Sequence, residues 1–431
     1  MYDLVIIGGG PAGYSAALEA IRHNLKVAVF EASKLGGTCL NRGCVPTKYL
    51  SHLAKLYQAV INAENEGIFA NEININFKNV KKRMVEIISA QRESLKEELA
   101  DKGVDIIEGS ASILGSSEVT CDGRIYEARN ILIATGSMAA PPLISNAVTS
   151  DDLLRQDSLP DKVSILGGGS IAVEFAYIFR AFGEDVDIYI RSDRLLKNWD
   201  KEIAVGITQS LKKKGIRINK NVDFSELEIN EGVILSANGR IPQLPCMPQD
   251  YIEVGPSGGI VVNKEYQTSV ENIYAVGDVI EGSMKLAHVA MEQGRRAVRY
   301  MIGEPVSPEA EVIRCIHIDQ EAASVGPDEK NAVSLGIDAA IGKVNMYSNA
   351  RTQISGADRG FVKVLADKKN KKIVGAHLLC EHAGDIISEL ALGINEGLTI
   401  SEMLRSIRPH PSYCEAVTEA LRSVEEKLVK Y

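Results

Sequence analysis

The sequence has no excess of basic residues. Its 48 Lys and Arg stand against 57 Asp and Glu, which gives a formal net charge of -9 at pH 7. A protein that binds nucleic acid needs a basic face, so this balance argues against a nucleic-acid partner. The chain also lacks an apolar run long enough to span a bilayer, which argues against a membrane protein.

A signal peptide is not recognisable either. The opening residues Met1-Tyr2-Asp3 lead straight into the apolar stretch Leu4–Ile7, without the basic and apolar segments of a secretory leader. We therefore expect a cytoplasmic protein, and structural disulfides are rare in that compartment. Most of the seven cysteines are expected to be free thiols, and a pair that does bridge is expected to be catalytic.

Only two of the cysteines lie close together in the sequence. They are Cys39 and Cys44, within the stretch Leu35–Lys48. The chain has no second Cys-x-x-Cys or Cys/His pair that would complete a zinc site, so we expect no metal. Five residues of regular helix rise ~7.5 Å, which exceeds the roughly 4.4–6.8 Å between the Cα atoms of a disulfide. If the two thiols bridge, the helix is distorted there, and Gly43 gives the backbone the necessary freedom.

What the sequence does contain is a nucleotide-binding pattern at its start. The apolar strand Tyr2–Ile7 is followed by Gly8-Gly9-Gly10-Pro11-Ala12-Gly13, a helical run and a second strand that ends at Glu31. Gly8 permits the tight turn, Gly10 lets a pyrophosphate approach the backbone, and Gly13 lets the helix pack closely on the strand. The helix N-terminus offers N–H groups to phosphates, and Glu31 can accept hydrogen bonds from ribose hydroxyls.

The same pattern occurs a second time. The apolar run Lys162–Leu166 leads into Gly167-Gly168-Gly169-Ser170-Ile171-Ala172-Val173-Glu174, then a helix and the strand Val186–Ile190. Two fingerprints in one chain imply an α/β protein with two Rossmann-like domains and two bound nucleotides. The residues expected to contact the second nucleotide are Gly167, Gly169, Ser170, Ile171, Glu174 and Gly239.

The end of that second strand bears on the choice of nicotinamide cofactor. An acidic residue there would bind the 2′-hydroxyl of NADH, but the position is Ile190, followed by Arg191, Arg194 and Lys197. These cations can pair with the 2′-phosphate of NADPH. We therefore predict NADP(H) over NAD(H), although Asp193 counts against it and a charged surface loop is the alternative interpretation.

The stretch Leu35-Gly-Gly-Thr-Cys39-Leu-Asn-Arg-Gly-Cys44-Val-Pro-Thr-Lys48 resembles the redox-active disulfide of the flavoprotein pyridine nucleotide-disulfide oxidoreductases. That resemblance implies that Cys39 and Cys44 form the redox disulfide beside FAD. Cys44 would be the charge-transfer thiolate and Cys39 the interchange thiol. Lys48 would lie near the flavin and pair with Glu174. A positive charge at Lys48 would stabilise both reduced flavin and thiolate.

The resemblance extends to the FAD site and to the division into domains. It implies a glutathione-reductase-type fold with an FAD domain at residues 1–147 and 244–304, an NAD(P) domain at 148–243 with a shortened β-meander, and an α+β dimerisation domain at 305–431. The residues that would contact FAD are Gly8, Gly10, Pro11, Ala12, Gly13, Glu31, Gly37, Thr38, Lys48, Ala134, Thr135, Gly136, Gly277, Asp278, Leu286, Ala287 and His288, the last through backbone rather than by acid–base chemistry.

The C-terminal part resembles the family's dimerisation domain, with an amphipathic helix at Ala383–Asn395 and the run His410-Pro411-Ser-Tyr-Cys-Glu415. An imidazole held by a carboxylate is a good proton acceptor near neutral pH. By the resemblance, His410 and Glu415 reach the interchange thiol of the other subunit in a homodimer, and the His410–Pro411 bond is cis.

The absence of three features that related enzymes have narrows the class of substrate. The C-terminus Leu428–Tyr431 has no extra redox pair, as large thioredoxin reductases need, and Cys414 stands alone where mercuric reductases have vicinal cysteines. Leu18 and Glu19 replace the two arginines with which glutathione reductases hold their substrate. A dihydrolipoamide dehydrogenase-like enzyme remains, with a dihydrolipoyl-bearing protein or a small dithiol or disulfide as substrate. The resemblance implies a 2-oxo acid dehydrogenase or glycine cleavage complex as its partner. The alternatives are an NADPH-dependent reductase of another small disulfide or metal, and a non-catalytic flavoprotein subunit.

Overall fold

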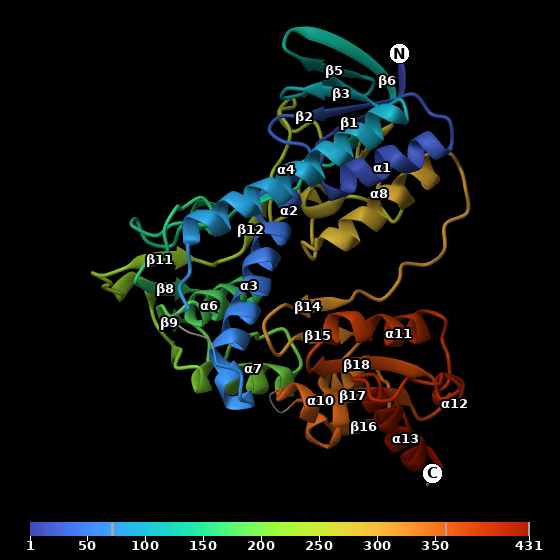
Figure 1. The fold of residues 1–431 in the computed structure, drawn as a ribbon. Coiled ribbons are helices and arrows are strands. Elements are labelled where there is room, and N and C mark those ends of the chain that lie inside the picture. Colours follow the sequence, from blue (N-terminus) through green and yellow to red (C-terminus); the bar gives the residue numbers. More distant parts are fainter. Residues whose placement is uncertain (70–72, 358–359, 430–431) are drawn as a thin grey trace.

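The computed structural model describes residues 1–69, 73–357 and 360–429. Figure 1 shows an upper part that carries the N-terminus, and a lower part in which residues 162–236 lie to the left of the C-terminal segments. The α/β fold class expected from the sequence is confirmed, with two nucleotide-binding units and an additional C-terminal unit. In the part of the chain that the structure describes, no helix has the length and apolarity needed to cross a membrane.

The first nucleotide-binding domain is built on a seven-stranded sheet in the order β3-β2-β1-β6-β5-β4, with β13 also paired to β6. The pairs among β3, β2, β1, β6 and β13 are parallel, whereas β4, β5 and β6 pair antiparallel. The strands are β1 (Tyr2–Ile7), β2 (Val27–Glu31), β3 (Asp105–Glu108), β4 (Ser112–Gly115), β5 (Glu118–Cys121), β6 (Arg124–Ile133) and β13 (Ile273–Ala275).

Helices α1 (Pro11–Arg22), α4 (Phe77–Asp101) and α8 (Ala287–Met301) lie together beside this sheet (Figure 1). Small residues let them approach closely: a Cβ on Gly13 would lie 1.9 Å from the carbonyl oxygen of Gly8, and a Cβ on Gly294 would lie 2.3 Å from that of Ala12. Only glycine fits at these positions, so α1 packs tightly against both the strand turn and α8. Helix α8 therefore lies beside the first fingerprint, although it comes more than 260 residues after α1 in the chain.

The second nucleotide-binding domain has a four-stranded sheet in the order β10-β9-β8-β11, and every pair in it is parallel. Between β10 and β11 the described residues form only the short 3-10 turn η2 and no strand. A two-stranded antiparallel ribbon of β7 and β12 connects this domain to the first. The elements are β7 (Ser137–Ala139), α5 (Ser150–Leu153), β8 (Lys162–Leu166), α6 (Ser170–Ala181), β9 (Asp185–Tyr189), α7 (Lys201–Lys213), β10 (Arg217–Asn219), η2 (Phe224–Glu226), β11 (Val233–Ser236) and β12 (Arg240–Pro242).

The C-terminal domain, called the interface domain below, is a five-stranded antiparallel sheet in the order β14-β15-β18-β17-β16. Helices α11 and α13 pack on this sheet. Its elements are β14 (Arg314–Ile316), β15 (Ala322–Val325), α9 (Glu329–Ser334), β16 (Ala339–Asn345), η4 (Met346–Ser348), α10 (Ala350–Ser355), β17 (Phe361–Asp367), β18 (Ile373–Leu379), α11 (Ala383–Asn395), α12 (Ile400–Met403) and α13 (Glu415–Val429). The short turns η1 (Ala63–Glu66) and η3 (Gly277–Val279) lie elsewhere in the chain.

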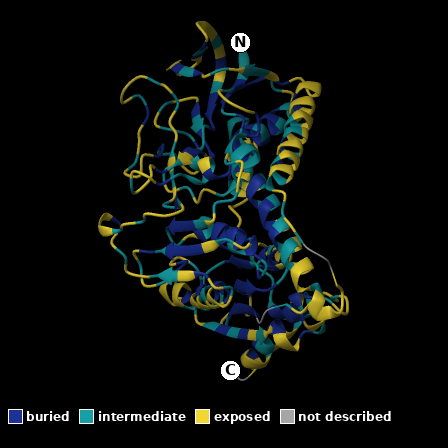
Figure 2. Ribbon diagram, turned by 60° about the vertical axis from the view of Figure 1, so that its left-hand side comes forward, coloured by how far each residue is buried: buried dark blue, intermediate teal, exposed yellow. Residues whose placement is uncertain are grey.

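The second nucleotide-binding domain and the interface domain share one apolar core. Phe361 and Leu379 of the interface sheet belong to the same cluster as Ile203 and Ile207 of α7. A Cβ on Gly206 would lie 2.3 Å from the side chain of Leu379, so α7 sits directly against this face of the sheet. Figure 2 shows buried residues concentrated in the sheets and their inner helix faces. The two domains are therefore held together by burial of apolar surface, and not by a linker alone.

Candidate active site

The two neighbouring cysteines lie on either side of a break between two helices. Cys39 lies on α2 (Gly37–Arg42), and Cys44 is the first residue of α3 (Cys44–Asn62). Gly43 separates them with φ -137° and ψ -105°, outside the helical region. The distortion that the sequence predicted at Gly43 is confirmed. Both cysteines are free thiols in this structure, so their oxidation to a disulfide stays a prediction.

The two thiols are in contact and differ in their electrostatics. A hydrogen bond from the Cys39 thiol lowers the pKa of Cys44 to about 7, and the Lys48 ammonium contributes in the same direction. The same bond, together with burial, raises the pKa of Cys39. The N-terminus of α3 adds its positive dipole end at Cys44. Near neutral pH the pair therefore favours a thiolate at Cys44 and a protonated thiol at Cys39.

The opposite pKa shifts of the two thiols lead to a testable prediction about the pH dependence of the reduced enzyme. In the two-electron-reduced enzyme, the thiolate-to-flavin charge-transfer band should grow as the pH rises, with a midpoint near 7 from Cys44. Lys48→Met should move the midpoint upward, since it removes a positive charge that stabilises the thiolate. Lys55→Met is the matched control, because Lys55 lies on the same helix but pairs with Glu321. A midpoint that is the same in Lys48→Met and wild type would contradict the assigned role of Lys48.

Lys48 is held by the second nucleotide-binding domain. Its Nζ donates to both carboxylate oxygens of Glu174 on α6, at 3.0 and 2.8 Å. The same carboxylate accepts the backbone N–H of His317 at 2.9 Å, and Ser51 donates to the carbonyl of His317 at 2.6 Å. Burial acts to lower the pKa of Lys48, but Glu174 outweighs it and the net direction is upward. The expected pairing of Lys48 with Glu174 is thus present, and the lysine stays charged.

Two residues at this place were not found by sequence reasoning. Burial raises the pKa of Tyr14, and the nearby Cys39 and Cys44 add to that rise, so its ring lies close to the redox pair. Burial lowers the pKa of His317, and the Lys48 ammonium adds to that effect. Tyr14 follows the glycine fingerprint directly, but nothing in the local pattern marks it. His317 comes from the interface domain, and no sequence signal connects it to Lys48.

The first fingerprint has the geometry of a phosphate site. Gly10 occupies the N-cap of α1 in an extended conformation and no side chain caps it, so the N-terminal N–H groups are available for a ligand. A Cβ on Gly37 would lie 2.8 Å from the Cα of Gly10, so the two backbones form a close cradle. Glu31 accepts N–H groups from Gly9 and Ser33 at 2.9 and 2.8 Å, which fixes its carboxylate at the end of β2.

A cavity of about 410 Å³ opens beside Glu31 and Gly37, between this turn and α4. Its size and its mixed polar and apolar lining suit part of a dinucleotide. The cavity, the uncapped helix and the glycine cradle could together hold the adenosine end of FAD. Of the expected FAD residues, Gly8, Gly10, Pro11, Ala12, Gly13, Glu31, Gly37 and Thr38 all lie on the β1–α1 turn, the end of β2 or the start of α2.

The other expected FAD residues gather around Asp278. The hydroxyl of Ser137 donates to Asp278 at 2.6 Å and accepts from Arg240 at 2.9 Å, which leaves further lone pairs of the carboxylate for a ligand. Ala134, Thr135 and Gly136 follow β6, and the N–H of Ala134 donates to the carbonyl of Ile7 beside the fingerprint. Gly277 begins η3 beside Asp278, and Leu286 and Ala287 begin α8. The imidazole of His288 contacts the backbone carbonyl of Ile313 at 2.8 Å.

The second fingerprint repeats this geometry. Gly167 has φ +136°, and a Cβ there would lie 2.4 Å from the carbonyl oxygen of Ala237. Gly169 is the uncapped N-cap of α6, and Ser170 and Ile171 form its first turn. Gly239, with φ +104°, follows β11 at the same edge of the sheet. The helix N-terminus is therefore free to bind a second pyrophosphate, while Glu174 one turn later points to Lys48.

The basic loop after β9 surrounds the expected adenosine end. Arg191 lies with its guanidinium 5.8 Å from the ring centroid of Phe224. Arg194 donates to the carbonyl of Lys197 at 2.7 Å within the loop, so part of its donor capacity is used locally. We take Arg191, the first of the three cations after β9, as the one that meets a 2′-phosphate, and that assignment stays a prediction.

The His410–Glu415 pair forms as expected. Nδ1 of His410 lies 2.8 Å from Glu415, and the His410–Pro411 bond is cis. Glu415 also accepts the N–H of Ser412 at 2.9 Å, and that bond and His410 lower the pKa of the Glu415 carboxyl. The His410 side chain is 73% exposed. Figure 1 shows α13, which begins at Glu415, at the lower end of the molecule and well away from α2 with Cys39. Within one chain the two groups do not meet.

Comparisons with known proteins agree over almost the full length. The family model described as "Pyridine nucleotide-disulphide oxidoreductase" matches residues 2–294, and that of its dimerisation domain matches residues 312–421. The dihydrolipoyl dehydrogenase of Mycoplasma genitalium is 34% identical over 98% of each chain. That of Bacillus subtilis is 32% identical over 100% of this chain and 99% of the relative. The crystal structure of LpdA from Mycobacterium tuberculosis superimposes with a TM-score of 0.90 at 26% identity, over 97% of this chain and 98% of that one.

Proposed function

Because the chain belongs to the pyridine nucleotide-disulphide oxidoreductase family, we propose that it oxidises dihydrolipoyl groups to their disulfides and passes the electrons to NADP⁺. The protein is an FAD-dependent disulfide oxidoreductase of the dihydrolipoyl dehydrogenase type. The dimerisation-domain match supports a homodimer. We extend the proposal to a dihydrolipoyl-bearing protein as substrate, within a 2-oxo acid dehydrogenase or glycine cleavage complex.

The proposed reaction begins with oxidised Cys39–Cys44. One substrate thiolate attacks the sulfur of Cys39 and breaks the S–S bond, so that Cys44 leaves as a thiolate. The second substrate thiol then displaces Cys39, which gives the lipoyl disulfide and two reduced cysteines. FAD, held by the first fingerprint, would supply a two-electron acceptor between these thiols and NADP⁺. Lys48 stabilises the Cys44 thiolate during this exchange, and Glu174 keeps the lysine in place.

The attacking substrate thiol needs a base in this scheme, and Cys39 needs a proton when the second substrate sulfur displaces it. The hydrogen bond to Cys44 and burial raise the pKa of Cys39, so the displaced sulfur takes up a proton at neutral pH. His410, oriented by Glu415 through Nδ1, can accept a proton at its other nitrogen. Because His410 is exposed and distant from Cys39 in its own chain, the proposal places His410 of the partner subunit at this thiol. The interface would bury more than roughly 2,000 Å², as obligate dimers do.

The observation that carries the proposal is the contact of Cys39 with Cys44 beside the Lys48–Glu174 pair. The test is an anaerobic titration of the FAD-loaded enzyme with dihydrolipoamide, NADPH and NADH in turn. Dihydrolipoamide should produce the long-wavelength charge-transfer band and should support NADP⁺ reduction. If NADPH gives the band but dihydrolipoamide does not, the enzyme is instead a reductase of another disulfide or metal.

Glutathione is disfavoured as that other substrate. Glu19, in the place of one arginine that would hold its carboxylate, is 2% exposed and pairs with Arg299 at 2.7 Å and with Arg22 at 3.1 Å. Burial acts to raise the pKa of Glu19, but Arg299 and Arg22 outweigh it and the net direction is downward. Glu19 therefore stays ionised and paired with these two cations, and it offers no donor to a substrate carboxylate.

The NADP preference rests on Arg191 and has its own test. Arg191→Glu should raise the KM for NADPH by roughly one to two orders of magnitude, because it replaces a charge-assisted pair with repulsion. The KM for NADH should change far less, so the preference should fall or reverse. Lys212→Glu makes the same charge change on the exposed side of α7 and serves as the matched control. An unchanged preference in Arg191→Glu would assign Arg191 to the surface loop alone.

A further inference from the structure

The loop at residues 191–199, which the proposed function places at the adenosine end of NADP, is fixed at its middle to the second fingerprint. Leu195 and Leu196 are fully or almost fully buried. Leu196 has φ +52°, a left-handed conformation that a leucine rarely adopts without strong local contacts. Its N–H donates to the carbonyl of Gly168 at 2.7 Å. The position of this loop is therefore set by surrounding structure, since its own sequence does not favour that backbone.

The end of the loop is held by Arg314 of the interface domain. Nη1 of Arg314 donates to the carbonyl of Asn198 at 2.8 Å. The guanidinium lies 5.0 Å from the ring centroid of Trp199, within the range of a cation–π contact. Arg314 begins β14, so this contact joins the interface sheet to the last two residues of the loop. The two positions are 116 residues apart in the sequence.

A second anchor follows at the next residue. Asp200 is the N-cap of α7, where one carboxylate oxygen accepts the N–H groups of Glu202 and Ile203 at 3.0 and 3.1 Å. The other oxygen accepts from Lys363 of β17 at 2.7 Å. Both side chains are 1% exposed. Asp200 therefore begins α7 and at the same time ties it to the interface domain.

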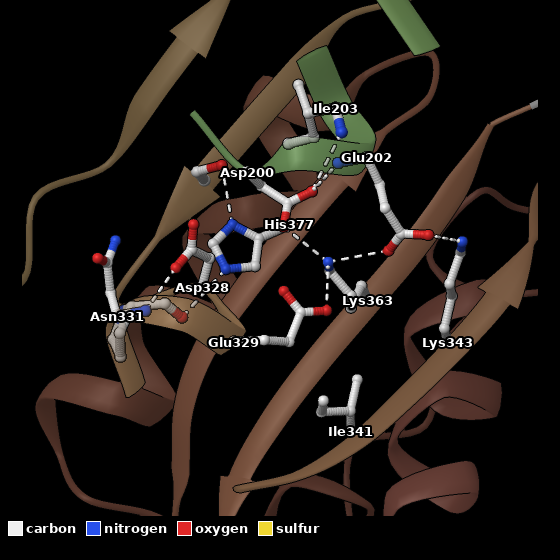
Figure 3. A network of polar contacts seen from close by, with 12 residues as sticks. Asp200, Glu202, Ile203, Asp328, Glu329, Asn331, Ile341, Lys343, Lys363 and His377 are labelled. Carbon is white, nitrogen blue, oxygen red and sulfur yellow. Dashed lines mark hydrogen bonds and ion pairs between the residues drawn. The ribbon is translucent and has the colours of Figure 1, made fainter. Parts of the chain in front are cut away.

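Lys363 uses its whole ammonium group in this cluster of carboxylates. Figure 3 shows its Nζ between the carboxylates of Asp200, Glu202 and Glu329, with distances of 2.7, 2.9 and 2.7 Å. An ammonium group has three N–H donors, and all three are used. Side chains alternate along a strand, and Val362 and Val364 belong to the cluster with α13, so Lys363 points to the opposite face, toward α7. Lys343, which is partly exposed, pairs with Glu202 at the rim.

The cluster is a costly way to join two domains that already share an apolar core. Burying a charge is unfavourable unless it is paired, and apolar residues of similar size would usually serve stability as well. What the ion pairs add is direction, because two of the hydrogen bonds of Lys363, those to Asp200 and Glu202, fix where α7 begins. The loop at 191–199 ends at that same point.

We propose that Arg314 and Lys363 of the interface domain are positioning residues for the nicotinamide nucleotide, acting through Asn198, Trp199 and Asp200 on the loop that holds its adenosine end. The inference rests on the proposed function in one respect, the assignment of this loop to the adenosine end of the nucleotide. It makes nucleotide affinity depend on a domain that contributes no residue to the second fingerprint. The dithiol half of the reaction, at Cys39 and Cys44, does not depend on these anchors.

The test measures binding of two probes that differ only in the 2′-phosphate, adenosine 2′,5′-bisphosphate and 5′-AMP, to the FAD-loaded dimer by titration calorimetry. Two variants release the anchors: Arg314→Ala, and the double change Lys363→Met with Asp200→Asn. The double change removes one charge of each sign, and asparagine keeps the N-cap. Each should raise the Kd of the bisphosphate roughly tenfold. The charge-transfer band produced by dihydrolipoamide should be unchanged, which a general loss of structure would not allow.

Lys343→Met is the matched control, because it removes an ion pair with Glu202 at the same cluster but leaves Lys363 and Asp200 in place. Its Kd should stay within about twofold of wild type. If the double variant fails to fold, Arg314→Ala decides alone. If wild-type protein binds both probes equally, the NADP preference is contradicted. In that case, loss of the anchors in the variants would have to weaken 5′-AMP binding by the same factor for the inference to hold. An unchanged Kd for both probes in the folded variants overturns the inference.

Discussion

Replacing Cys44 by serine is expected to lower dihydrolipoamide oxidation by at least roughly a thousandfold. A serine hydroxyl can neither form the disulfide nor carry the thiolate charge that the structure concentrates at this position. Two-electron reduction should then produce no charge-transfer band. The measurements are kcat with dihydrolipoamide and the long-wavelength absorbance after anaerobic reduction.

Cys246→Ser is the matched control for this change, since Cys246 is exposed, free and remote in sequence from the redox pair. It should leave both kcat and the band close to wild type. Cys39→Ser should also lose dithiol oxidation, but it keeps the thiolate and should keep a charge-transfer band, which separates the two roles. A band that persists in Cys44→Ser would show that the roles of Cys39 and Cys44 are assigned the wrong way round.

Mixing two inactive variants is expected to restore activity. Cys39→Ser lacks the interchange thiol and His410→Ala lacks the base, so each homodimer should be nearly dead. Random reassociation of equal amounts gives half heterodimers, and each heterodimer has one site with both groups intact if His410 serves the other subunit. Activity should therefore return to about a quarter of wild type. The physical reason is the distance within one chain between the His410–Glu415 pair and α2.

The experiment needs independent evidence that subunits exchange, for which one variant carries an affinity tag and the heterodimer is isolated. The control is a mixture of Cys39→Ser with Cys44→Ser, in which no heterodimer contains an intact site. This mixture should stay dead. Isolated heterodimers of the first mixture that remain inactive would show that His410 does not act across the interface.

Much of the fold follows from local patterns. The strand Tyr2–Ile7, the strand Lys162–Leu166 and the helix Ala383–Asn395 have the bounds that apolar periodicity predicted. The strand expected at Val186–Ile190 runs instead from Asp185 to Tyr189. Such small differences arise because hydrogen bonding, and not hydropathy, decides where an element ends. The domain limits remain predictions.

The residues of the candidate site also fall into two groups, those that a local sequence pattern indicates and those that only the tertiary structure brings together. Neighbours in the sequence, such as the glycines of each fingerprint, Glu31, Cys39 and Cys44, could be recognised because their roles depend on backbone geometry within a few residues. The pairing of Lys48 with Glu174 came only from the resemblance to a family. Tyr14 and His317 were not found at all, because they reach the redox pair through packing of separate elements.

The sequence by itself determined that the chain has two nucleotide-binding fingerprints and that two cysteines are separated by a helix break, since turns, fingerprints and Gly43 act locally on the backbone. Only the tertiary structure decided which charges meet. Lys363 joins Asp200 across 163 residues and Arg314 joins Asn198 across 116. Neither pair has a local signature in the sequence. A charged residue in a strand or a loop is expected to be exposed, and only the tertiary structure shows that it is buried against a partner. Burial of apolar surface between α7 and the interface sheet brings these partners together.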